Sequence, residues 1–144
     1  SRRRSPMLRA VAASLAIAAA ATPLPQWKDK HPQAAQALQH WVEKNSDAAR
    51  RLFTWDGTHP ERTKAMIDWA LDKPRDDATA FHTKHQDWPE FQELLDKHRN
   101  ALNDFLAWAR EHPDATKDLM GHPRALEWVG KHLYPPGTRQ ARTR

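Results

Sequence analysis

The chain has 144 residues, of which 39% are apolar and 28% charged, enough for one domain with a modest core. It contains no Cys, which excludes disulfides, thiolate zinc sites and a cysteine nucleophile. The net charge is +5, but seven of the 23 basic residues lie within residues 1–9 and 139–144, which leaves 16 elsewhere against all 18 acidic residues. Because this body is slightly acidic, we predict no basic groove for nucleic acid on it, and any association with nucleic acid would run through the basic tails.

Residues 1–25 form a basic and then apolar segment. Four arginines and no acid come before Ala10, and residues 10–21 are apolar apart from Ser14. This layout fits a cleaved secretory signal and an organellar transit peptide equally well. Residues 8–24 also fit a short membrane anchor or an ordinary buried Ala-rich helix. We therefore expect a targeting or membrane-anchor segment, and an exported or organellar protein that is membrane-associated if this segment is retained.

Tryptophan recurs at a fixed interval in the body of the chain. Trp27, Trp41, Trp55 and Trp69 are each 14 residues apart, and the unit W-x-x-x-H-P begins at Trp27, Trp55 and Trp108. Proline fits the first turn of a helix, since its missing N–H is not needed there and its φ is already helical. The pattern predicts an all-α fold: an array of short helices with a Trp/Pro-punctuated repeat, preceded by the N-terminal apolar helix.

The repeat also places the expected helices. The predicted short helices span residues 32–43, 46–55, 60–71 and 74–84. One longer central helix is expected over residues 88–110, where apolar residues recur at spacings of three and four. Two short helices follow at 113–120 and 123–133. The helical domain is then residues 26–134, and the basic tail 135–144 is expected to be disordered.

Nine histidines are the feature that most suggests chemistry, since imidazole is a common metal ligand and a haem axial ligand. His82 and His85 stand three residues apart at an expected helix end, and with His98 they are our candidate metal site. The alternative for the pair is a solvated helix end, and for His98 a buried histidine bonded to a neighbour. The chain has no Cys-x-x-Cys-His motif, so any haem would be bound non-covalently.

Most of the tryptophans share helical spacing with leucines, which predicts a place in the core. Trp27, just after the Pro-rich segment, and Trp128, near the end of the last helix, are the two that we expect to be exposed anchors for a protein partner.

The sequence shows no Gly-rich phosphate loop, no nucleophile with its base and no paired carboxylates with a reason to be buried. We therefore predict a non-enzymatic protein without catalytic or dedicated cofactor-binding residues. The favoured hypothesis is a structural or adaptor protein that acts by protein–protein contact, as an accessory subunit of a membrane or organellar assembly. The alternative hypothesis is an exported protein that binds haem or a divalent transition metal through His82, His85 and His98, with His112 as a further candidate ligand.

Overall fold

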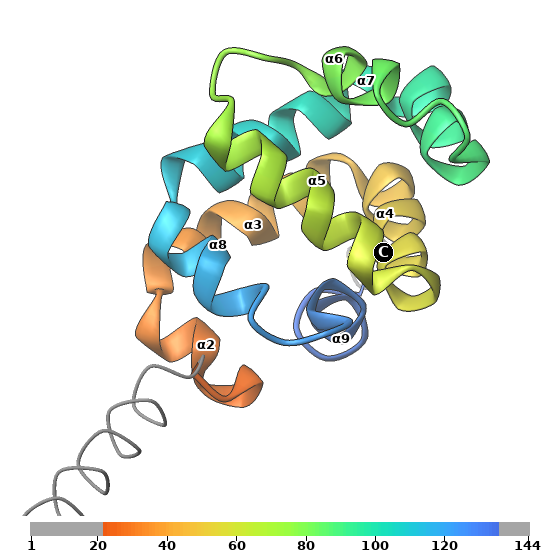
Figure 1. Ribbon diagram of the computed structural model, residues 1–144. Helices are drawn as coiled ribbons and strands as arrows, with labels where there is room; N and C mark the ends of the chain where they lie inside the picture. The colour runs from red at the N-terminus through yellow and green to blue at the C-terminus, as the bar shows by residue number, and fades with distance from the viewer. Residues whose placement is uncertain (1–21, 136–144) are drawn as a thin grey trace, which may run out of the picture.

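The computed structural model describes residues 22–135, within which the chain forms helices and no strand (Figure 1). The helices are α2 (Leu24–Lys30), α3 (Pro32–Lys44), α4 (Ser46–Thr58), α5 (Pro60–Asp72), α6 (Ala78–Thr83), α7 (Pro89–Glu111), α8 (Pro113–Leu119) and α9 (Ala125–His132). The predicted all-α class is confirmed. The predicted N-terminal apolar helix and basic tail fall almost entirely on residues 1–21 and 136–144, outside the described residues.

Most successive helices are joined by a single residue in one recurring backbone conformation, with φ between −122° and −137° and ψ between 53° and 73°. At each of these joint residues the backbone N–H donates to the carbonyl of the Trp four residues earlier, over 2.7–3.0 Å. The joint residues are His31, Asn45, His59 and His112, together with Lys73, which ends α5 in the same conformation but opens a longer loop to α6. The Trp repeat thus sets where helices end, because each Trp carbonyl closes the last turn before the chain bends.

The longer central helix is broken by a sixth joint. His98, inside α7, has φ −138° and ψ 43°, close to the values of the other joint residues. The expectation of one continuous helix was therefore wrong. The break leaves no mark in the sequence because Leu94 stands where the other units have Trp, and Arg99 stands where most of them have Pro. Leu94 nevertheless keeps the interval, since it lies 14 residues before Trp108.

The helix predicted over residues 74–84 begins later than expected, at Ala78. The guanidinium of Arg110 donates to the backbone carbonyls of Ala70, Lys73 and Asp76 over 2.6–2.8 Å. These bonds hold the segment after α5 as an open loop, in which the chain reverses direction. The helix predicted over residues 46–55 also continues further, through Thr58, because its joint residue is His59.

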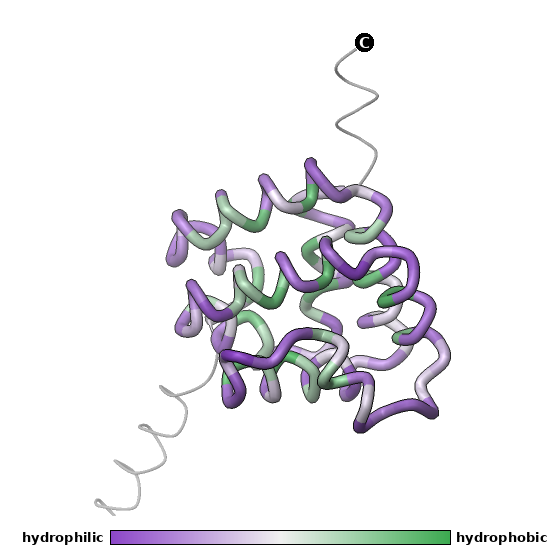
Figure 2. The backbone as a smooth tube through the Cα atoms, turned by 90° about the horizontal axis from the view of Figure 1, so that it is seen from above, coloured by the Kyte–Doolittle hydropathy of each residue, from purple (hydrophilic) through white to green (hydrophobic). Residues whose placement is uncertain are grey.

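The helices form two antiparallel limbs. The outgoing limb comprises α2 to α5, and the returning limb comprises α6 to α8, so that α2 packs on α8 while α3, α4 and α5 pack on α7. Helix α9 closes the fold against α4. Hydrophobic segments of the helices face the middle of the molecule, as Figure 2 shows from above. No helix within residues 22–135 has the length and apolar character needed to cross a membrane.

The α4–α9 contact depends on a buried carboxylate. Asp56 has an exposed fraction of 0%, and its Oδ2 accepts the backbone N–H of Glu127 in the first turn of α9 over 3.1 Å. Its Oδ1 accepts the hydroxyl of Thr63. Arg124, just before α9, has a left-handed φ of 59° and donates from Nε to the carbonyl of Gly57 over 3.0 Å. Burial raises the pKa of Asp56, although hydrogen bonds to the carboxylate partly offset this effect.

The start of the described chain is fastened to the end of α8. Asp118 accepts the backbone N–H of Thr22 over 2.6 Å and the ring N–H of His31 over 2.8 Å. Nε2 of His122 donates to the carbonyl of Thr22 over 2.6 Å. Partial burial raises the pKa of Asp118, but the hydrogen bonds from Thr22 and His31 and the charge of Lys30 lower it more, so the net shift is downward.

Candidate functional site, a groove between α4 and α7

Three buried tryptophans connect the two limbs through their indole N–H groups. Each donates to the carbonyl of a buried alanine that stands three residues after a joint residue, in the first turn of a helix. The bonds run from Trp27 to Ala115 (2.9 Å), from Trp41 to Ala101 (2.8 Å) and from Trp108 to Ala34 (2.9 Å). A methyl side chain at this position leaves room for the indole to reach the carbonyl.

Trp55 occupies the same place in its unit, but its indole N–H finds no acceptor among the described residues. It is as buried as its counterparts, with an exposed fraction of 4%. On the returning limb it meets Phe91, the third residue of α7, at 5.6 Å between ring centroids. Phe91 therefore holds the third position of its helix, where the three other pairs have an alanine.

Two more buried nitrogens, Nε1 of Trp69 and Nε2 of His82, also lack a partner within the described chain. Both belong to the same aromatic cluster as Trp55, because Trp69 contacts the ring of Phe81 at 5.1 Å and His82 contacts that of Phe91 at 6.0 Å. Phe81 and Phe91 pack edge-to-face at 5.4 Å. Since more than nine in ten buried polar groups are normally paired, the clustering of these exceptions distinguishes this end of the molecule.

A groove of about 440 Å³ opens beside Trp55. Besides Trp55, α4 contributes Arg50, Arg51, Thr54 and Thr58 to its lining, and α7 contributes Glu90, Glu93 and Leu94. One wall is therefore basic and the other acidic. Arg51 and Glu93 pair across the groove at 3.3 Å, but their exposed fractions of 41% and 55% mean that this pair holds the walls together only weakly.

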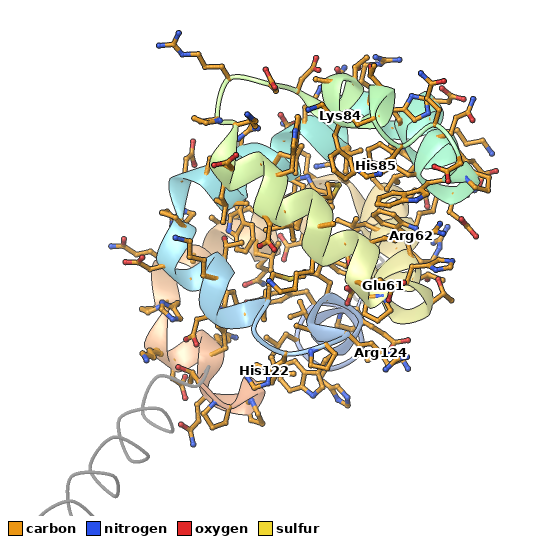
Figure 3. The ribbon with its side chains drawn as sticks, in the orientation of Figure 1. Glu61, Arg62, Lys84, His85, His122 and Arg124 are labelled. Carbon is orange, nitrogen blue, oxygen red and sulfur yellow. The ribbon has the colours of Figure 1, made fainter. Side chains whose placement is uncertain are left out.

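At the end of the groove near Glu90, the surface is built from stacked and charged side chains. The carboxylate of Glu90 lies 3.5 Å from Nε2 of His59 and 3.9 Å from Nη1 of Arg62. The Arg62 guanidinium lies over the ring of Trp88 at 4.9 Å, and His85 stacks on the same ring at 4.0 Å. Figure 3 shows Arg62 and His85 close together at this end of the molecule. Arginine stacked on tryptophan is a common feature of binding surfaces.

The three histidines of the candidate metal site lie in different settings. His82 is in α6, His85 is in the turn that follows, and His98 is the joint residue within α7. Within residues 22–135, no three His, Asp or Glu side chains come close enough to hold a metal ion. His82 and His85 share the aromatic cluster, and both contact Phe81 or Phe91.

The expectation that Trp27 is exposed was wrong. Its exposed fraction is 0%, because it packs against Trp108 and bonds to Ala115. Its place in the 14-residue series already carried this information, since it shares the spacing of tryptophans assigned to the core. Trp128 is half-buried on α9, with its ring 5.1 Å from that of His132. Sequence reasoning placed Trp55 in the core and missed the groove.

Comparison with known proteins adds no relative from which a function could be carried over. No protein-family model matches the chain. Searches of the curated proteins and of the solved structures likewise find no match.

Proposed function

We propose that the chain is a non-enzymatic structural or adaptor protein that binds another protein through the α4–α7 groove, as an accessory subunit of a membrane or organellar assembly. The observation that carries the proposal is the buried Trp55 N–H, which has no acceptor within residues 22–135 and belongs to a side chain that lines a groove with one basic and one acidic wall. The membrane or organellar setting rests on the composition of residues 1–25 alone.

The energetic argument concerns the cost of an unpaired donor. A buried N–H without an acceptor costs roughly 1–3 kcal/mol, and a partner that supplies the acceptor recovers much of this free energy on binding. Tryptophan and arginine are the residues most enriched among those that dominate binding energies at protein interfaces. Trp55 lines the groove together with the exposed Arg50 and Arg51 of α4 and with Leu94 of α7.

Site-specific photocrosslinking in the native host tests this proposal. A photoreactive amino acid at Thr54, an exposed residue that lines the groove, is expected to give one discrete crosslinked protein. The same group at His40, exposed on α3 and absent from the groove lining, is the matched control. Arg51→Glu, which makes both walls acidic, is expected to reduce the Thr54 crosslink at least several-fold.

Equal crosslinking at Thr54 and His40, or a Thr54 crosslink that Arg51→Glu leaves unchanged, would refute groove-mediated binding. Fractionation of the same cells tests the setting. A protein found entirely in the soluble cytoplasmic fraction would contradict membrane or organellar assembly.

A second candidate function has its own observation. Nε2 of His82 is buried without a partner from the described residues, in an aromatic cluster that also holds His85, and planar haem or a transition metal would use such a nitrogen. Protein purified from its native source would then show a visible absorbance band or bound metal, which His82→Ala would abolish. A colourless, metal-free preparation rules this candidate out.

A further inference from the structure

We infer that the groove recognises the first turn of a partner's helix, one that carries a small residue at its third position, and that a carbonyl of this turn accepts the Trp55 indole N–H. This inference rests on the proposed function and deepens it by naming the structure that the partner presents. It follows from how the chain satisfies its other buried tryptophans.

Within its own fold, the chain supplies a backbone acceptor to the buried indole N–H of three other tryptophans. The acceptors for Trp27, Trp41 and Trp108 are the third residues after joint residues, and all three are alanines with exposed fractions of 8% or less. Trp55 is the buried tryptophan of the same repeat for which the returning limb supplies Phe91 instead of alanine. A partner helix that starts with a small third residue would offer Trp55 the backbone acceptor that the returning limb does not supply.

The charges of the groove agree with such an occupant. Helix first turns favour acidic residues, since these offset the positive end of the helix dipole. Arg50 and Arg51 on the α4 wall complement such an acid, while Glu90 and Glu93 on the α7 wall face the positive end of the dipole. Glu90 and Glu93 have exposed fractions of 51% and 55%, so their side chains can turn aside at little cost.

Nuclear magnetic resonance on the ¹⁵N-labelled full chain tests the inference through its seven indole N–H signals. The probe is a synthetic peptide with the sequence of residues 112–120, which begins a helix with Pro, Asp and Ala, followed by an Ala- and Lys-rich stretch that keeps it helical. The control peptide differs only by Phe at the position of Ala115. We expect the Trp55 signal to move downfield and saturate, and the control peptide to bind at least roughly five-fold more weakly, the effect of one lost hydrogen bond.

The Trp69 indole is the internal reference, because it also has no acceptor in the described part of the chain but does not line the groove. Its signal is expected to stay in place. The Trp55 signal is assigned by its loss in Trp55→Phe or, if that variant does not fold, by its magnetisation transfer to Phe91. A Trp55 signal that is unmoved by millimolar peptide, or moved equally by both peptides, overturns the inference. A shift that depends on protein concentration without any peptide also overturns it, since the occupant would then be a second copy of the chain.

The two tests fail separately. If the Thr54 crosslink depends on Arg51 but neither peptide moves the Trp55 signal, the adaptor function stands and recognition of a helix start is wrong. If the crosslinking controls fail, the proposed function falls whatever the peptides do.

Discussion

The indole nitrogens of this chain fall into two kinds, those that donate to a backbone carbonyl and those that do not. Trp41 and Trp55 are buried to similar degrees, with exposed fractions of 7% and 4%, but among residues 22–135 only Trp41 finds an acceptor. Replacement by Phe removes a comparable volume at either position and removes a hydrogen bond only at Trp41. We expect Trp41→Phe to lower the free energy of unfolding by about 1 kcal/mol more than Trp55→Phe.

Urea denaturation of the two variants measures this difference. Equal losses would show that the Trp41 bond adds nothing beyond packing. A larger loss for Trp55→Phe would show that its N–H is paired in solution, contrary to the basis of the groove proposal.

Asp56 is the buried acid on which the α4–α9 contact depends. In Asp56→Asn, the amide oxygen can accept the Glu127 N–H while the amide nitrogen donates to Thr63, whose hydroxyl can donate to the carbonyl of Pro60. We expect this variant to stay within about 1 kcal/mol of the parent at neutral pH, whereas Asp56→Ala loses about 2–3 kcal/mol because the Glu127 N–H is left unpaired.

The pH dependence of stability provides the control for Asp56. Its folded pKa is raised above the usual 3.8, so between pH 3.8 and the folded pKa the folded protein holds a proton that the unfolded chain has lost. Its contribution to stability is therefore fully present below pH 3.8 and is lost as pH rises through the folded pKa. Urea titrations from pH 3 to 7 measure the free energy of unfolding of the parent minus that of Asp56→Asn, and we expect this difference to fall as pH rises. A difference that increases with pH would contradict the raised pKa.

At the scale of elements, the joint at His98 makes α7 two helices in succession. Most other joint residues are followed by Pro, which needs no N–H at the first position of a helix. We therefore expect Arg99→Pro to cost less than about 1 kcal/mol, although it would break a continuous helix. Ala107→Pro, at an exposed site inside the second half of α7, should cost about 3 kcal/mol. Thermal unfolding compares the two variants, and equal losses would mean that α7 is continuous in solution.

Much of this element order could be predicted because Trp and Pro punctuate the sequence at a regular interval. The interval alone did not reveal the joint at His98, where Leu94 and Arg99 replace the marker residues. The loop after Lys73 was also missed, because it depends on bonds from Arg110, which lies far along the chain. The groove could not be predicted for a similar reason. Whether Trp55 has an acceptor depends on which residue of the returning limb lies opposite it, and the spacing of residues within one helix does not reveal this neighbour.

At the scale of the molecule, Asp118 fastens the first helix of the outgoing limb to the last helix of the returning limb. Its folded pKa is lowered, so its contribution to stability is present above the usual 3.8 and is lost as pH falls through the folded pKa. We expect Asp118→Asn to destabilise the protein by about 1–2 kcal/mol at neutral pH, and this loss to shrink on acidification. Urea titrations at pH 6 and pH 3 measure it, and a loss that grows in acid would contradict the lowered pKa.

The contacts between the two antiparallel limbs close loops of increasing length, each of which encloses the shorter ones. The pairing of α6 with α7 closes a short stretch of chain, that of α3 with α7 a longer one, and that of α2 with α8 nearly all of residues 22–120. Because closing longer loops costs more entropy, we expect contacts near the chain reversal after α5 to form first on folding. Contacts at the far ends of the two limbs should be lost first on unfolding. Native-state hydrogen exchange is expected to show that the amides of α2 exchange before those of α3 and α4. The segment preceding Thr22 would then be attached to the part of the fold that unfolds locally at the lowest free-energy cost.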